Sequence, residues 1–236
     1  MAAGWAAKRF WAEVTVEAVA GGFGVRLDAR AVKTPAKAAF VVPSRALAEA
    51  VACEWRAQQG VVDPQAMPFT RYANSAIDKV AAQFDEVVAI VAAYGASDLL
   101  CYRAVGPDRL VVRQAAAWDP LLAWVAGLGA PLKAVAGVMH IAQPPTSLAV
   151  LTGRVGALDI FGLAGFHDLV AISGSLVIGL AVIDGWAAPD VLWPLCRIDE
   201  DWQAEVWGAD EEAEAAGALK RQDFLRAAEF YALCRA

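Results

Sequence analysis

The amino-acid sequence predicts an α+β fold, with a small N-terminal antiparallel β-rich lobe followed by a larger, mostly α-helical lobe. In the first 45 residues, short runs of alternating apolar and polar residues are separated by glycine and proline. From about residue 70 onward, apolar residues instead recur at the three- and four-residue spacing of helices. This change of pattern is the natural boundary, so we expect a β-rich domain over residues 1–65 and a helical domain over residues 66–236.

The N-terminal runs have the features of a small meander of strands. Val14 and Val16 show the alternation of a sheet that buries one face, and Gly21 and Gly22 mark a tight turn after them. Proline bounds the two later runs, which are therefore short. The predicted strands are residues 10–16, 23–28, 31–34 and 39–42.

Helices are predicted for the rest of the chain. Ser44 is a suitable N-cap for the first of them. Asp119 followed by Pro120 has the order of an N-cap and a first helical residue, so a new helix is expected to begin there. The predicted helices cover residues 45–59, 70–93, 108–118, a segment from 119, 147–158, a long apolar segment through 183, a segment from 189, and 210–233.

The most apolar segment, Leu169–Ile183, raises the question of a membrane span. Its 15 residues would form a helix about 22 Å long, whereas crossing a bilayer takes about 20 residues. Small residues at helical spacing, Ala171, Ser175 and Gly179, would let a neighbouring helix approach closely. We therefore predict a buried core helix without membrane insertion, and a membrane-associated subunit is the alternative.

Charge is distributed unevenly along a chain of formal net charge −6. Residues 8–37 carry six basic and three acidic side chains, whereas residues 184–214 carry ten acidic side chains and one arginine. A nucleic-acid-binding protein needs a basic footprint for phosphates, so nucleic acid is not expected as a partner. The polarity suits a protein that steers one charged partner onto one face, and ordinary solvation would also account for it.

The chain lacks the sequence patterns of metal and cofactor sites. Its cysteines and histidines stand far apart, without the spacing of zinc ligands, so neither a metal nor a cofactor is expected. They are Cys53, Cys101, Cys196, Cys234, His140 and His167. An enzyme of unknown type, using the acidic cluster at residues 199–212 or Cys101, is the alternative to a binding protein.

Nine tryptophans are the most unusual part of the composition. Trp55 and Trp118 fall in apolar helical stripes, so we predict structural roles for them. Trp202 and Trp207 lie among acidic residues and are candidates for a protein interface, where tryptophan is enriched. The predicted partner-binding residues are Glu205, Trp207, Asp210, Glu211 and Glu212.

Several strings, in order along the chain, resemble a known family. They are Lys8-Arg9-Phe10-Trp11, Val25–Arg30, Val32–Pro35, Glu54-Trp55, Gln58-Gln59, Met67–Arg71, Ala73–Asp78, Asp98–Arg103, Trp118–Leu121, and Trp207-Gly208 with Glu211. Together they resemble the family of chaperones that assemble the F(1) sector of F-type ATP synthase. The resemblance spans nearly the whole chain.

The resemblance implies a function that composition does not. A member of this family would bind the free alpha subunit of F(1), shield its beta-facing surface from aggregation and release it during hexamer assembly. Glu211 matches the acidic residue after Trp-Gly in the family's terminal motif, which implies a functional role for it. We further expect a non-enzymatic protein that acts as a monomer without a cofactor. Because no signal peptide or import presequence is recognised before the first motif, we expect a bacterial cytoplasmic protein.

Overall fold

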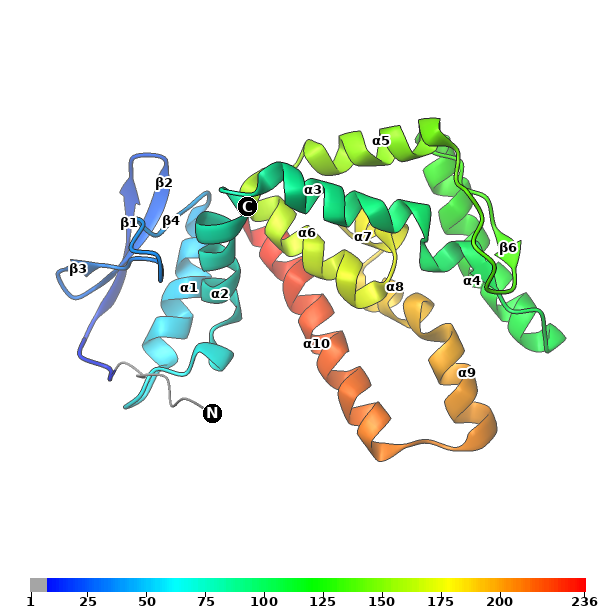
Figure 1. The fold of residues 1–236 in the computed structure, drawn as a ribbon. Coiled ribbons are helices and arrows are strands. Elements are labelled where there is room, and N and C mark those ends of the chain that lie inside the picture. The colour runs from blue at the N-terminus through cyan, green and yellow to red at the C-terminus, as the bar shows by residue number, and fades with distance from the viewer. Residues whose placement is uncertain (1–7) are drawn as a thin grey trace. The chain divides into compact units, whose positions relative to one another are not determined.

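The computed structural model describes residues 8–236, and by their contacts these residues form two compact units (Figure 1). The first unit holds the described chain up to Phe84, together with Ile160–Gly165 and Glu229–Ala236. The second unit holds Asp85–Asp159 and Phe166–Ala228. A small antiparallel sheet precedes a long series of helices, so the predicted α+β class is confirmed. The domain division at residue 65 stays a prediction.

The sheet is built around its second strand. β1 (Val14–Val19) and β2 (Gly22–Leu27) pair antiparallel, and β3 (Arg30–Ala31) and β4 (Val41–Val42) both pair with β2. Only glycine fits at Gly22, which has φ +150°, because a Cβ there would lie 2.2 Å from the carbonyl oxygen of Val42. A side chain at this position would therefore separate β4 from the sheet.

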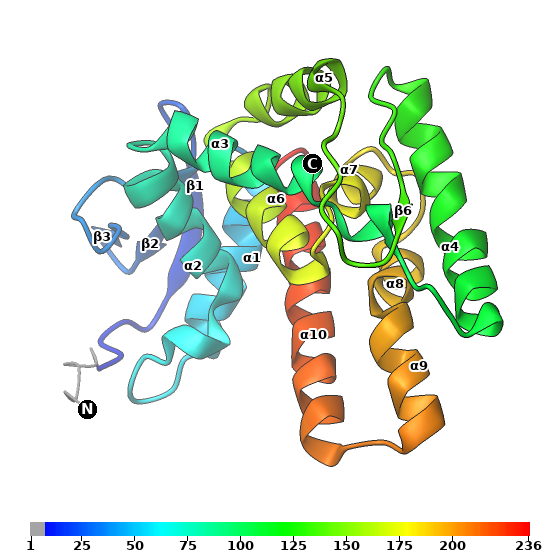
Figure 2. The same cartoon turned by 45° about the vertical axis from the view of Figure 1, so that its right-hand side comes forward.

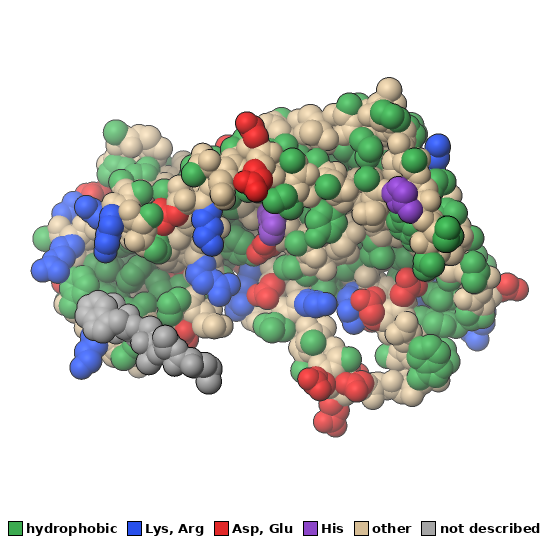
Figure 3. Space-filling view, viewed as in Figure 1, with side chains coloured by type: hydrophobic (Ala, Val, Ile, Leu, Met, Phe, Trp, Pro, Cys, Tyr) green, Lys and Arg blue, Asp and Glu red, His purple; other side chains and the backbone are tan. Residues whose placement is uncertain are grey.

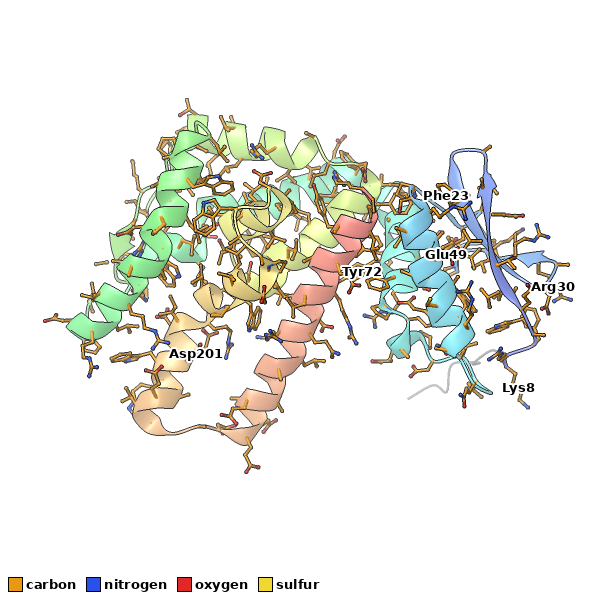
Figure 4. All side chains as sticks on the ribbon, turned by 180° about the vertical axis from the view of Figure 1, so that it is seen from behind. Lys8, Phe23, Arg30, Glu49, Tyr72 and Asp201 are labelled. Carbon is orange, nitrogen blue, oxygen red and sulfur yellow. The ribbon has the colours of Figure 1, made fainter. Side chains whose placement is uncertain are left out.

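Helix α1 (Arg45–Ala57) packs against β1 and β2. The Ser44 side chain accepts a hydrogen bond from the Leu47 amide at 3.0 Å, which confirms the predicted N-cap. After α1 come a 3₁₀ turn (Pro64–Ala66) and helix α2 (Pro68–Ser75). Tyr72 of α2, labelled in Figure 4, stacks on Phe230 with ring centroids 4.9 Å apart.

Glu54, buried in α1, caps the first turn of α2. Its carboxylate accepts hydrogen bonds from the Phe69 amide at 2.7 Å, the Thr70 amide at 2.8 Å and the Thr70 hydroxyl at 2.6 Å. Burial raises the pKa of Glu54, and the hydrogen bonds from Thr70 and Phe69 oppose that shift. One carboxylate thus satisfies amides that α2 cannot pair within itself.

Helices make up most of the second unit, which also holds a two-stranded parallel ladder of β5 (Tyr102–Arg103) and β6 (Val135–Ala136). Helices α6 (Ile160–Ser173) and α10 (Glu211–Leu233) contribute residues to both units. The helices after α2 are α3 (Phe84–Ala93), α4 (Asp108–Gly127), α5 (Pro145–Gly156), α6 (Ile160–Ser173), α7 (Leu176–Ile183), α8 (Pro189–Leu192), α9 (Ile198–Trp207) and α10 (Glu211–Leu233).

Two predicted helix boundaries are wrong around residues 70–127. The expected single helix over 70–93 is interrupted by a π turn (Ala76–Val80) and by non-helical residues before α3. The expected break at Asp119 is absent, because α4 runs through Pro120. The buried positions of α4 continue at helical spacing on both sides of the exposed proline, so packing outweighs the lost backbone hydrogen bond. They are Leu110, Gln114, Trp118, Leu121 and Val125.

The predicted long helix through Ile183 is also wrong, because it is two helices. Gly174, with φ +70°, ends α6, and the Ser175 side chain caps α7 by accepting from the Ile178 amide at 3.0 Å. The small residues therefore do not form one ladder. Gly179 makes a close approach, since a Cβ there would lie 2.7 Å from Val170. None of the helices in the described residues is long and apolar enough to cross a membrane.

Asp98 is fully buried and holds this break in place. It accepts hydrogen bonds from the Leu100 amide at 3.0 Å, the Ser175 hydroxyl at 2.8 Å and the Val177 amide at 3.0 Å. It thereby caps the 3₁₀ turn Leu99–Cys101 and the start of α7 together. Burial raises the pKa of Asp98 to about 6, against the opposing effect of these hydrogen bonds.

Replacing Glu54 tests its capping role. Glu54→Gln keeps the shape but offers an amide NH₂ where the carboxylate accepted from Thr70 or Phe69. We expect the free energy of unfolding to fall by about 1–3 kcal/mol, measured by urea denaturation. Glu49→Gln, in the same helix and labelled in Figure 4, is the matched control. Glu49 makes a half-exposed ion pair with Arg56, so its loss should change stability by less than about 0.5 kcal/mol. Equal losses in the two variants would contradict the capping role.

The raised pKa of Asp98 predicts a pH dependence of stability. The folded state binds a proton at this carboxyl up to about pH 6, whereas an unfolded aspartic acid releases it near pH 4. The contribution of Asp98 to the free energy of unfolding therefore falls as pH rises through this window, by about 2 kcal/mol between about pH 4.5 and pH 7. Asp98→Asn should lose this component, so its unfolding free energy should decline less with pH than that of the parent. Identical pH slopes for parent and variant in urea denaturation would rule out the assigned shift.

Candidate partner-binding site

The acidic residues predicted to bind a partner lie on a helical hairpin in the second unit. Helix α9 and helix α10 form its two arms, and residues 208–210 join them at the tip (Figures 1 and 2). Residues 203–216 are all exposed, so the outer part of both arms contributes nothing to a core. Short isolated helices are marginally stable in water. The hairpin must therefore be held by its caps and by contacts near its base.

The tip is shaped by a glycine and an aspartate. Gly208, with φ +95°, ends α9, and its amide donates to the Ala204 carbonyl at 3.0 Å. The Asp210 carboxylate accepts from the Ala213 amide at 2.9 Å, which makes Asp210 the N-cap of α10. Part of the hydrogen-bonding capacity of Asp210 is therefore used within the hairpin.

The other predicted residues differ in how freely they face outward. Glu211 and Glu212 are exposed in the first turn of α10, where the helix dipole favours negative charge. Trp207 is 79% exposed, which is unusual for so large an aromatic side chain. Glu205 accepts from Arg113 of α4 at 2.7 Å, so it fastens α9 to α4. In the space-filling view, acidic side chains gather at the start of α10 (Figure 3).

A groove of about 700 Å³ lies between the two arms. Its walls combine small residues of α10, charged residues of both arms and the ring of Trp207. Of the predicted partner-binding residues, Trp207 and Asp210 line this groove, and Glu205, Glu211 and Glu212 do not. The predicted residues therefore fall into a pair inside the groove and three others outside it.

Residues that position the hairpin were not singled out from the sequence. Gln114 of α4 is buried, and its amide donates to Asp199 at 2.6 Å while its oxygen accepts from the Ala104 amide at 2.8 Å. Arg197 donates to Glu200 at 3.1 Å near the base of α9. Glutamine and arginine are common on helix surfaces, so their spacing alone carried no signal for these partners.

The two tryptophans predicted to be structural are placed differently. Trp118 is 1% exposed, and its indole nitrogen donates to the Leu195 carbonyl at 2.7 Å. Trp55 is half-buried and packs edge-on against the buried Trp11, with ring centroids 5.3 Å apart. Each makes packing contacts within its own unit.

The geometry gives little support to the alternative of an enzyme. Cys101 is buried, and burial together with the nearby Asp98 raises the pKa of its thiol to about 12, which opposes a reactive thiolate. Three acids of the 199–212 cluster, Asp199, Glu200 and Glu205, are engaged by Gln114, Arg197 and Arg113. Within residues 8–236, no group of three or more metal-ligating side chains comes together.

Comparison with known proteins gives a family for this chain. Residues 8–126 match the model of the ATP12 chaperone protein family. The crystal structure of Atp12 from Paracoccus denitrificans is 50% identical, with a TM-score of 0.94, and the match covers 97% of this chain and 99% of that one. The structure of a point mutant of the same Paracoccus protein matches at 49% identity, with a TM-score of 0.94 and coverage of 97% and 98%.

A third structure, the Atu1473 protein of Agrobacterium tumefaciens, is 41% identical, with a TM-score of 0.89 and coverage of 95% of this chain and 84% of that one. The family match, the near-complete coverage and the shared fold confirm the resemblance seen in the sequence motifs. The chain therefore belongs to the ATP12 family of ATP synthase assembly chaperones.

Proposed function

We propose that this protein binds the free alpha subunit of the F(1) sector of ATP synthase, shields its beta-facing surface and releases it as the hexamer forms. The observation that supports this most is the unpacked acidic hairpin, where residues 203–216 are all exposed and carry five acidic side chains without a basic one. The chain belongs to a chaperone family, and a chaperone needs an exposed surface on which to bind its client. In this proposal the protein acts as a monomer in the bacterial cytoplasm, without membrane insertion or a cofactor.

The physical logic of such a holder is simple. A subunit that lacks its obligate partner exposes a large apolar surface, which invites aggregation. A protein that covers this surface prevents that, and it must then lose the competition to the true partner by mass action. Release by competition needs no ATP hydrolysis, so the proposal requires no catalytic group.

The predicted residues take different roles in this proposal. Glu211 and Glu212 contact basic groups of the client, because both are exposed beside the tip. Trp207 supplies an aromatic contact from the end of α9. Asp210 and Glu205 mainly hold the hairpin in shape, through the N-cap of α10 and the ion pair with Arg113, and reinforce the acidic surface.

Co-expression with the alpha subunit tests the function. We expect a soluble one-to-one complex whose affinity falls as ionic strength rises, since exposed charges are screened over about 10 Å at 0.1 M salt. The measurement is the amount of soluble alpha subunit, followed by mass determination of the complex by light scattering. If the chaperone does not increase soluble alpha subunit under any condition, the proposed function is wrong.

A paired charge reversal tests the site separately. Glu211→Lys with Glu212→Lys should weaken the complex by at least about ten-fold, equivalent to about 1.4 kcal/mol. The matched control is Asp85→Lys with Glu86→Lys, which makes the same charge change in the exposed first turn of α3. Both variants should cost similar helix-dipole energy, so a difference in affinity reports contact with the client. Equal affinities for the two variants would move the client contact away from Glu211 and Glu212.

A further inference from the structure

The residues that line the groove between α9 and α10 are spaced as expected for one face of each helix. On α9 the lining positions Glu200, Ala204 and Trp207 recur at helical spacing, and on α10 the positions Ala213 and Gly217 do the same. Residues of the opposite faces, such as Ala215, do not line the groove. The groove is therefore a defined surface of the hairpin.

The chemistry of the groove changes along its length. At its base, the guanidinium of Arg197 lies beside Gly217 of α10, since a Cβ on Gly217 would be 3.4 Å from it. Trp193 closes the same end and packs on Phe224 with ring centroids 5.5 Å apart. Between base and tip the groove is lined by small side chains, among them Ala204, Ala213 and Ala216. Asp201, labelled in Figure 4, lies in the first turn of α9 and lines the groove from that helix.

The rim of the groove toward the tip is strongly acidic. Asp210 and Glu214 line it, and Glu211 and Glu212 stand beside them on the first turn of α10. The base, in contrast, holds three basic residues, Arg197, Lys220 and Arg221, together with the acidic Glu200 and Asp201, so charges there nearly balance. An occupant that complements the groove therefore carries apolar side chains toward the small residues of its middle and positive charges toward the tip.

We propose that the α9–α10 groove receives an amphipathic α-helix of the client, with an apolar stripe flanked by Lys and Arg. This inference rests on the proposed function and names the kind of surface that would be held. A helical turn with side chains is roughly 10–12 Å wide and 5.4 Å long, so a groove of about 700 Å³ accommodates on the order of one to two turns. Helices commonly bind in grooves of this kind through residues at i, i+3, i+4 and i+7.

Filling the groove gives the sharpest test. Ala216 lines the groove and Ala215, its neighbour, does not, and both are exposed on α10. Ala216→Trp should block an incoming helix, whereas Ala215→Trp introduces the same side chain on the outer face. We expect Ala216→Trp to weaken the complex with the alpha subunit by at least about ten-fold and Ala215→Trp to change it by less than about two-fold. Thermal unfolding should be alike for the two variants, because neither position is packed.

A second measurement separates the groove from the identity of the client. The probe is a fluorescently labelled helical peptide of Leu, Ala and Lys, with Leu on one face, compared with a peptide in which Glu replaces Lys. The Lys peptide should bind the parent and Ala215→Trp but not Ala216→Trp, and the Glu peptide should bind none of them. Binding should weaken between about 50 mM and about 300 mM NaCl.

The outcomes decide between the two proposals. If the alpha subunit binds both tryptophan variants equally, the groove proposal is overturned and the proposed function stands. If the parent does not bind the alpha subunit, the proposed function falls, and the peptide measurement alone decides whether the groove holds a basic helix. If light scattering shows a dimer of the parent that Ala216→Trp dissociates, a second copy of the chain occupies the groove and the client proposal is wrong.

Discussion

The hydrogen bond between Gln114 and Asp199 fixes the place where the hairpin leaves the packed part of the second unit. Outside this point neither arm is buried, so hydrophobic burial cannot determine its direction. Polar contacts do so instead, through Gln114 at the start of α9 and through Arg113 and Glu205 further along the same arm. Both donors, Gln114 and Arg113, belong to α4, so this packed helix positions the exposed arm α9. A surface held in this way can stay open for a partner without collapsing onto its own core.

Buried carboxylates organise the helices in each unit by the same means. Glu54 in the first unit and Asp98 in the second each accept several hydrogen bonds from groups at the start of another helix or turn. Taking a carboxylate out of water costs free energy, which is why burial raises the pKa of both. The hydrogen bonds offset part of that cost and give each helix a single starting residue. These contacts specify geometry more than they add stability.

The sequence alone predicts the structure where local signals determine it. It does not do so where contacts between residues far apart in the chain determine it. The N-cap at Ser44 follows from a capping residue next to its helix, and alternation located four strands. The bounds of the strands were less accurate, since the first runs from Val14 to Val19 and not over residues 10–16. The break at Gly174 depends on Asp98, which lies 77 residues away from Ser175 and is invisible to periodicity. Pro120 gave a helix-start signal that packing on both sides overrode. For the candidate site, the sequence showed a run of acidic residues near the tip, but the groove arises from the relative placement of two helices and could not be predicted from residue spacing.

An open groove with a charged rim suits a holder that must later give up its client. In the proposed complex, apolar contact with the small residues of the groove would provide modest binding, and the acidic rim would add attraction that acts mainly on the rate of association. A deeper, fully enclosed pocket would bind more tightly but would release slowly. Since the client of an assembly chaperone must pass to its permanent partner, fast and reversible binding is the more useful property. The same exposure that leaves residues 203–216 without a core therefore supports the function proposed for them.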